Sequence, residues 1–239
     1  MFYDWTYILV LAGALLCMIA SAGVKSTYKK YSRVPAACGM TGAEVAERLL
    51  SINNISDVSV NHISGSLTDH YNPKTGEVNL SDDVYDSRSV AAIGVAAHEC
   101  GHVMQHNNGY VPLAIRSALV PIANFGSNLG LPMVIIGLIL GIGYTRSGQD
   151  SIGMIIAEIG IVLFCFGVLF QLITLPVEFN ASHRALKMLE KNEILEREEI
   201  SGSRAVLGAA AMTYVAAAAS SILQLLRLLL IVNNNRRRD

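Results

Sequence analysis

Four residues that can bind metal ions or move protons lie close together in the stretch VAAHECGHVMQHNNG. They are His98, Glu99, His102 and His106, and the whole chain of 239 residues has only six histidines. Because residues four apart share one face of a helix, His98 and His102 can offer two imidazole nitrogens to a single ion. Glu99 lies at the edge of that face, where a carboxylate can take a proton from water without binding the metal. The pattern therefore predicts a zinc site suited to hydrolysis.

The stretch that carries these residues has the pattern of a buried helix. The apolar run VAAIGVAA precedes His98 and would hold both histidines in fixed positions. A serine cap at Ser87 or Ser89 fits the start of this helix, and the run NNG that ends at Gly109 is a strong stop signal. We therefore expect the histidines on one rigid helix.

The composition favours a membrane protein. Hydrophobic residues make up 52% of the chain, charged residues make up 15%, and the mean hydropathy is +0.42. A net charge of −1, without basic residues interleaved with aromatic ones, does not resemble a nucleic-acid-binding surface. The cysteines are far apart and indicate neither a disulfide framework nor a C-x-x-C site: Cys17, Cys38, Cys100 and Cys165.

Uncharged apolar segments mark the expected membrane spans. Residues 7–24 follow Asp4 and precede a cluster of lysines, which favours an uncleaved anchor with its N-terminus outside over a cleaved signal peptide. Residues 117–145, interrupted by Pro121 and Pro132, are expected to span once after an irregular first part. Residues 159–176 form a third span, with a glutamate at its start that is expected to reach the interface.

The last apolar segment, residues 205–226, leaves two alternatives. It is rich in alanine and ends at Arg227, so it is either a fourth span or a helix packed against a soluble region. The basic tail NNNRRRD favours a cytoplasmic C-terminus, and with it three spans rather than four.

Two polar regions, residues 25–112 and 177–204, are separated by two spans and are therefore expected on one face of the membrane. They contain seven and five basic residues. The opposite face has Arg146, joined by Arg236 to Arg238 if the last helix spans. The positive-inside rule thus predicts that the active site is on the cytoplasmic side.

The third metal ligand decides the class of site. A metzincin needs a histidine ten residues after the first and a glycine at seven, but Asn108 and Gln105 stand there. The alternative is a glutamate on a downstream helix, as in gluzincins. In the second polar region the candidates are Glu178, Glu190, Glu193, Glu196, Glu198 and Glu199.

Among these glutamates, Glu178 stands out by its position. It follows Pro176 where the third apolar segment ends and a new helix is expected to begin, whereas the later glutamates lie in the solvated run EKNEILEREE. Ser182, one turn after Glu178, could hydrogen-bond a ligating histidine and fix its tautomer. The residue type and place favour Glu178 as the ligand.

Other residues have lesser claims on the site. His106 continues the helical stripe one turn beyond His102 and could contact a ligand or the substrate. Cys100 lies two residues from each metal histidine and is expected to be a small buried residue that points away from the metal. Three further residues are candidates to stabilise an oxyanion, and the sequence does not choose among them: His183, Arg184 and Tyr214.

Local patterns outline the rest of the first polar region. MTGAEVAERLL begins with a capping box from Thr41 to Glu44 and predicts an amphipathic helix with Val45 and Leu49 on one side. DVSVNHI alternates as a strand does, and LTDHYNPKTGEVNLS predicts a hairpin with residues 72–76 as its turn. Such a strand beside the catalytic helix could pair with an extended peptide, or it could be an ordinary surface hairpin.

Taken together, these stretches resemble the YugP-type membrane zinc metallopeptidases of bacteria and, more distantly, the HtpX-like gluzincins. The resemblance implies one zinc ion bound by His98, His102 and Glu178, with Glu99 as the catalytic base. HtpX-like proteins commonly have an aspartate where this chain has Ser182, so the support expected from Ser182 is weaker. The likeness is carried by GMTGAEVA, LTDHYNP, LSDDVY, RSVAAIGVAAHECGHVMQH, LPVEFNASHRAL and AAAMTYVAAA.

The sequence therefore predicts a mainly α integral membrane protein, with transmembrane helices and a zincin-like α+β catalytic region that contains a short β-hairpin. The expected activity is zinc-dependent endopeptidase cleavage of membrane-associated polypeptides bound in extended form. A metal transporter would place its ligands within the membrane, and a catalytically inactive scaffold would have no need of Glu99, but both classes remain as alternatives. Partners are a polypeptide and the lipid bilayer, with no nucleic acid, and the sequence does not indicate an oligomeric state.

The expected organisation has six segments in chain order. An anchor is followed by the catalytic region with the H-E-x-x-H helix, two further transmembrane segments, a third-ligand helix with its connection, and the alanine-rich helix with the basic tail. Their bounds are residues 1–24, 25–112, 113–145, 152–176, 177–204 and 205–239.

Overall fold

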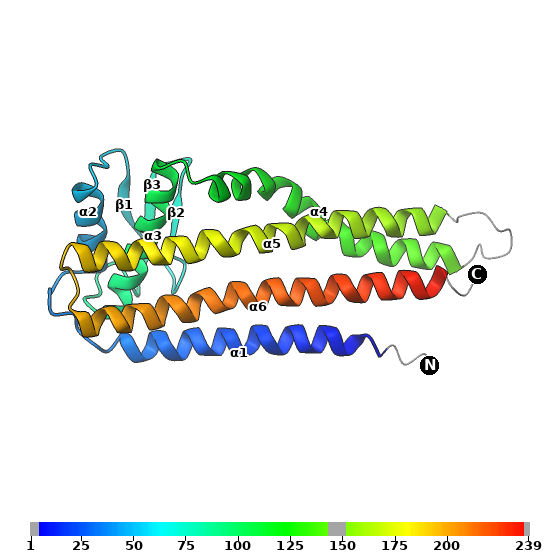
Figure 1. Cartoon of the computed structure of the whole chain (residues 1–239), viewed down its shortest axis with the longest axis horizontal. Helices are drawn as coiled ribbons and strands as arrows, with labels where there is room; N and C mark the ends of the chain where they lie inside the picture. Colours follow the sequence, from blue (N-terminus) through cyan, green and yellow to red (C-terminus); the bar gives the residue numbers. More distant parts are fainter. Residues whose placement is uncertain (1–4, 143–151, 237–239) are drawn as a thin grey trace. The chain divides into compact units, whose positions relative to one another are not determined.

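A computed structural model describes residues 5–142 and 152–236 (Figure 1). This part of the chain is mainly helical with one small sheet, as the sequence predicts, and it divides into two compact units. We call residues 20–114 and 176–213 the polar unit, and residues 1–19, 115–175 and 214–239 the apolar unit. Arg146 and the side chains of Arg236 to Arg238, which enter the charge comparison above, lie outside the described residues.

In the polar unit, α2 (Gly42–Ile52) begins with the predicted capping box. The Thr41 hydroxyl accepts a hydrogen bond from the Glu44 backbone N–H, and the Glu44 carboxylate accepts one from the Thr41 N–H. Val45 and Leu49 are buried on one side of the helix, which confirms its amphipathic pattern.

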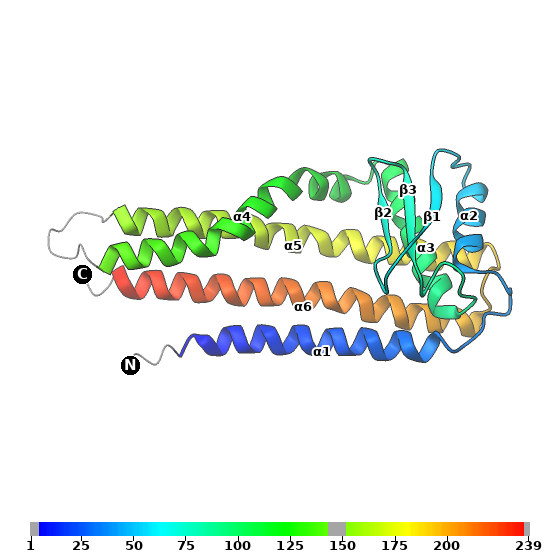
Figure 2. The same cartoon turned by 180° about the vertical axis from the view of Figure 1, so that it is seen from behind.

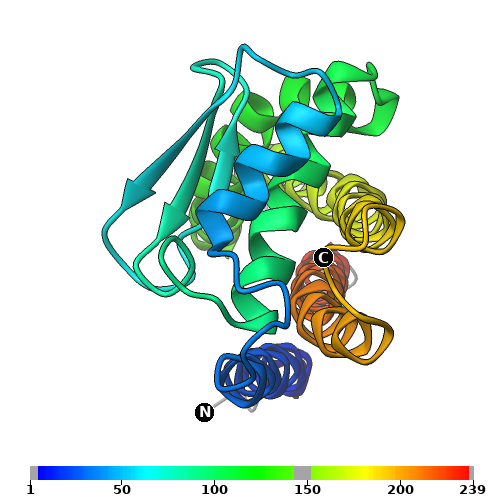
Figure 3. The same cartoon turned by 90° about the vertical axis from the view of Figure 1, so that its left-hand side faces the viewer.

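The sheet of the polar unit has three strands in the order β1-β3-β2. The predicted hairpin is confirmed: β2 (His70–Asn72) pairs antiparallel with β3 (Glu77–Ser81). β1 (Ser59–Ile63) lies on the other side of β3 and runs parallel to it. Both α2 and α3 (Val90–Asn107) cover one face of this sheet (Figures 2 and 3). β2 is therefore an edge strand beside α3.

The ends of α3 agree with the sequence signals. The Ser89 side chain caps the first turn by accepting a hydrogen bond from the Ala92 N–H at 3.2 Å. At the other end Asn108 is the C-cap, and Gly109 has a φ of +60°, a conformation that glycine adopts without strain. The motif thus lies on a single capped helix.

Four helices of the described residues are long and apolar enough to cross a membrane. They are α1 (Tyr7–Tyr31), α4 (Val111–Ile142), α5 (Ile152–Lys191) and α6 (Arg197–Arg236). At about 1.5 Å per residue, a helix of 40 residues such as α5 or α6 is about twice as long as a bilayer core requires.

Two expectations about these helices were wrong. The first part of α4 is helical from Val111 onward rather than irregular, and α5 continues through Pro176 instead of ending there. A proline removes one helical hydrogen bond but bends the helix rather than ending it when the freed groups find other partners. Figure 1 shows α4, which contains Pro121 and Pro132, as a bent helix.

The last apolar segment was expected to be either a fourth span or a helix packed against a soluble region, and α6 combines the two. Its residues 197–213 belong to the polar unit and its residues 214–236 belong to the apolar unit. The preference for three spans is therefore corrected to four candidate spans. The charge of the tail suggested otherwise, but helix length allows one element both to pack in the polar unit and to continue as a span.

Glycines bring helices of the apolar unit close together. A Cβ atom added at Gly160 on α5 would lie 2.7 Å from the carbonyl oxygen of Gly130 on α4, a distance that side chains do not tolerate. Large apolar side chains such as Ile139 and Val162 are exposed on these helices. Small residues between helices and large ones outside are typical of helices that pack in lipid.

Candidate metal centre

Three side chains of the polar unit converge on one point. His98 and His102 come from α3 and Glu178 comes from α5, and their ligand atoms all lie within 4.8 Å of one another. The Glu178 Oε2 atom is 3.3 Å from the His98 Nε2 atom and 3.6 Å from the His102 Nε2 atom. Zinc bonds of about 2.0–2.1 Å at tetrahedral angles place neighbouring ligand atoms about 3.3 Å apart. The two distances from Glu178 are close to this value, so the three side chains could hold one zinc ion.

The close approach of α3 and α5 depends on Gly101, which lies between the two metal histidines. A Cβ atom at this position would overlap the carbonyl oxygen of Ala181 on α5. Ala181 itself is fully buried. Small residues on both helices thus let α3 and α5 approach closely enough for the Glu178 carboxylate to reach the histidines.

The carboxylates at the centre are buried: Glu178 is 3% exposed and Glu99 is 6% exposed. Burial raises the pKa of Glu99, and the nearby rings of His98 and His102 offset only part of that rise. Burial alone would lower the pKa of His102, but the Glu178 carboxylate, 3.6 Å away, and the charge of Glu99 raise it overall. Glu99 is therefore a carboxyl group whose proton affinity is raised, as suits a general base.

Each histidine makes a hydrogen bond through its second ring nitrogen. The Ser182 hydroxyl lies 3.1 Å from the His98 Nδ1 atom, and the Gln105 Oε1 atom lies 3.0 Å from the His102 Nδ1 atom. Both contacts leave the Nε2 atoms directed toward Glu178. Such bonds orient metal-binding imidazoles.

Gln105 is a residue whose place at the centre was not recognised from the sequence. It is fully buried, and its amide nitrogen donates to the Val177 carbonyl oxygen at 2.8 Å and to the Asn180 Oδ1 atom at 3.0 Å. Its position three residues after His102 on the same helix was the available signal, since residues three apart are neighbours on a helix surface.

The other predicted residues lie outside the group of three. His106 is exposed, and its Nδ1 atom is 3.2 Å from the Tyr71 hydroxyl of β2. His183 is exposed on α5, while the Arg184 Nε–H donates to Asn180 at 2.7 Å. Tyr214 belongs to the apolar unit.

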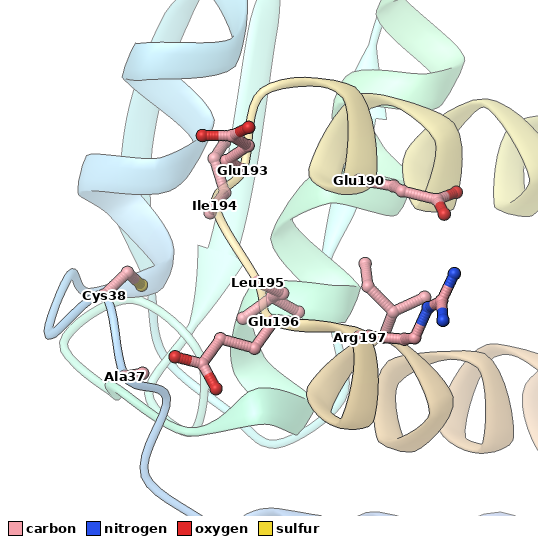
Figure 4. Close-up of a pocket in the computed structure, with 9 residues that line it drawn as sticks. Ala37, Cys38, Glu190, Glu193, Ile194, Leu195, Glu196 and Arg197 are labelled. Carbon is pink, nitrogen blue, oxygen red and sulfur yellow. The ribbon is translucent and has the colours of Figure 1, made fainter.

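Two further expectations concern residues near the motif. Cys100 is buried, as predicted, and its sulfur is 3.7 Å from the Ala46 carbonyl oxygen of α2. Three of the later glutamates surround a hollow of about 520 Å³ near the connection between α5 and α6, which Figure 4 shows. These glutamates are Glu190, Glu193 and Glu196, and none of them belongs to the group of three metal-binding side chains.

Comparison with known proteins also indicates a zinc peptidase. Residues 6–233 match the family described as "Putative neutral zinc metallopeptidase". The chain belongs to this family. It is also similar to the "Putative membrane protease YugP" of Bacillus subtilis (strain 168), with 44% identity over 208 residues that cover 87% of this chain and 88% of that protein. No solved structure matches the chain.

Membership in the neutral zinc metallopeptidase family agrees with the ligand set. Two imidazoles and one carboxylate are the ligands of many catalytic zinc sites, which keep a fourth position open. In this family member, His98, His102 and Glu178 can hold one such ion. The name of the similar Bacillus subtilis protein, a putative membrane protease, agrees with the four apolar helices of this chain.

Proposed function

We propose that the protein is a membrane-embedded zinc endopeptidase of the gluzincin type. His98, His102 and Glu178 hold the zinc ion, and Glu99 is the catalytic base. The observation that carries the proposal is the convergence of the three ligand side chains from two helices, with the buried Glu99 next to His98. The sequence pattern H-E-x-x-H supplies the residue types, and the fold supplies the distances.

The residues of the chain have separate tasks in peptide hydrolysis. A zinc ion at the site supplies Lewis acidity, which polarises a peptide carbonyl and acidifies water. The Glu99 carboxylate takes a proton from the attacking water and delivers it to the nitrogen of the leaving amine as the C–N bond breaks. The high proton affinity that burial gives to Glu99 supports the first of these transfers. Gln105 and Ser182 keep the imidazoles oriented.

The edge strand β2 supports the substrate class that we propose, a polypeptide bound in extended form. β2 is at the edge of the sheet and contacts α3, so an extended peptide could pair with its outer edge and pass by the metal group. Pairing of this kind needs several residues on either side of the scissile bond. We therefore expect purified protein to cleave peptides of eight or more residues and to leave dipeptides intact, and ready turnover of dipeptides would contradict this substrate class.

We place the active site on the cytoplasmic side and the substrates among membrane-associated polypeptides. The support is the number of basic residues in the two polar regions of the sequence. Thr75, in the exposed turn between β2 and β3, offers a test. A Thr75→Cys variant should resist membrane-impermeant thiol reagents in intact cells and react in inverted vesicles, and labelling from outside would overturn the assignment.

Activity of the purified full chain tests the function itself. In detergent, cleavage of a fluorogenic peptide should stop with a zinc chelator, return with added zinc and be absent in Glu99→Gln. A scaffold would bind zinc without any cleavage. A transporter would move zinc across proteoliposomes whether or not Glu99 was changed. Either result would exclude the peptidase.

A further inference from the structure

A chain of hydrogen bonds in the polar unit leads from α5 to the ring of His102. The Arg184 Nε–H donates to the Asn180 Oδ1 atom at 2.7 Å. The Gln105 Nε2 atom donates to the same oxygen at 3.0 Å, and the Gln105 Oε1 atom is 3.0 Å from the His102 Nδ1 atom. This series of hydrogen bonds therefore connects the Arg184 guanidinium, a permanent cation, to His102, one of the metal-binding histidines.

The chemistry of these groups fixes the direction of every bond. A guanidinium can only donate, so the Asn180 amide must turn its oxygen toward Arg184. That oxygen, together with the Val177 carbonyl oxygen, requires the nitrogen end of the Gln105 amide. The oxygen end of Gln105 then faces His102 and can only accept. His102 must carry its proton on Nδ1, which leaves the Nε2 lone pair for a metal.

His98 has no comparable constraint at its second nitrogen. Its partner is the Ser182 hydroxyl at 3.1 Å, and a hydroxyl can rotate to donate or to accept. Both tautomers of His98 therefore satisfy Ser182. Among the residues that the structure describes, the difference between the two histidines is that only the side-chain partner of His102 is itself held by further groups, the two acceptors of the Gln105 amide nitrogen.

Burial and neighbouring side chains keep this series of hydrogen bonds in place. Gln105 is fully buried, so its amide cannot exchange these partners for water without a large cost in free energy. The Arg184 guanidinium lies over the Tyr110 ring at 5.9 Å from its centroid, and the Tyr110 N–H donates to the Gln105 carbonyl oxygen. Arg184 thus contacts Asn180 and Tyr110, and both of these residues also contact Gln105, Asn180 at its side-chain amide and Tyr110 at its backbone carbonyl.

We propose that Arg184, Asn180 and Gln105 are positioning residues that fix His102 in its metal-binding tautomer. This gives Arg184 a task other than stabilising an oxyanion, and it rests on the proposed function, since it supposes that His102 binds zinc. The task is electrostatic and directional: the arginine orients one amide, which orients the next, which orients the imidazole.

Zinc affinity of the purified full chain, measured by competition with a chromogenic chelator, tests the proposal. Arg184→Met and Gln105→Met should each weaken zinc binding, with Gln105→Met in the range of about 10- to 100-fold. Arg184→Lys should restore most of the affinity, because an ammonium group also can only donate. Lys187→Met, which removes an exposed cation from the same helix, is the matched control and should bind zinc as the wild type does.

A direct role on the substrate predicts a different result. If Arg184 stabilised the oxyanion, Arg184→Met would lower kcat with unchanged zinc affinity, and the positioning role would be overturned. With the positioning role, KM stays unchanged and excess zinc restores much of the rate. If Gln105→Met does not fold, the comparison of Arg184→Met with Arg184→Lys alone tests the positioning role. Failure of the wild type to bind zinc at all would contradict the proposed function instead.

The tautomer can be observed directly. Nitrogen-15 NMR of histidine-labelled, zinc-free protein, recorded at a pH above the raised pKa of His102 so that its ring is neutral, should show His102 as a single Nδ1–H form in the wild type and in Arg184→Lys, with the signal assigned from a His102→Gln variant. Gln105→Met and Arg184→Met should show both tautomers. A single Nδ1–H form in both of these variants would overturn the proposal, because a merely structural role leaves the tautomer unchanged.

Discussion

The two helices that build the metal centre differ in how they are held. α3 is buried around most of its circumference, including residues on both sides of the motif such as Ala97 and Val103. Residues 176–191 of α5 bury only one stripe, at the helical spacing of Val177, Ala181 and Ala185. Both segments nevertheless supply ligands to the same site.

This difference separates the tasks of the two helices. The positions of His98, Glu99 and His102 relative to one another are set within α3, by its own regular geometry and surroundings. The position of Glu178 depends on contacts between the helices, at Gly101 and at the bond from Gln105 to the Val177 carbonyl. A change of Glu99 on α3 should therefore alter the chemistry, and changes at the contact between the two helices should alter metal binding.

The largest effect is expected where α5 supplies its ligand. Glu178→Ala should lose zinc on dialysis against a mild chelator and all measurable activity with it, because a site of two histidines binds weakly. Glu190→Ala and Glu196→Ala, at the hollow shown in Figure 4, should keep both. Metal analysis beside an activity assay checks the result. Zinc retained by Glu178→Ala but lost from either control would show that another glutamate is the ligand.

A change of the base on α3 should separate metal from turnover. Glu99→Gln should keep nearly stoichiometric zinc while activity falls by about 10²- to 10⁴-fold, because an amide cannot accept the proton of the attacking water. Metal analysis and an activity assay check this result as well. Loss of zinc from Glu99→Gln would mean that Glu99 is itself a ligand and that the two helices do not divide the work as described.

The contact between the helices can be changed without touching a polar group. Gly101→Ala should cost about 1–3 kcal/mol of stability and weaken zinc binding, because the added methyl group forces α3 and α5 apart. Gly208→Ala on α6 is the matched control, since a Cβ there meets nothing within 4 Å and a helix favours alanine. Thermal unfolding and zinc competition would be measured on both. Equal behaviour of the two variants would contradict the importance of this close approach.

The smallest effect is expected at Ser182. Ser182→Ala should weaken zinc binding by about tenfold or less, at the lower end for residues that orient a ligand. The side chain is only half-buried, so water can take the place of its hydroxyl beside His98. Chelator competition would show the difference from Gln105→Met, which should be larger. A greater loss in Ser182→Ala would reverse the ranking of the two histidines.

Features that depend on neighbours along the chain were determined by the sequence itself. The caps of α2 and α3 and the hairpin of β2 and β3 follow from local hydrogen bonding, which a short stretch contains in full. Helical spacing likewise places His98 and His102 on one face of α3 with Glu99 at its edge. The family and the first three membrane helices could be recognised for the same reason, since motif and apolar length are both read from consecutive residues.

Features that depend on which groups lie opposite one another required the tertiary structure. The sequence favoured Glu178 among six glutamates by its position, but the distance to the histidines depends on the packing of Gly101 against Ala181, which brings Glu178 to them. Gln105 was an unremarked helix residue until Asn180 and Val177 faced it across the interface. The parallel pairing of β1 and the continuity of α5 through Pro176 were likewise decided by distant partners, because local preference alone leaves several arrangements of similar free energy.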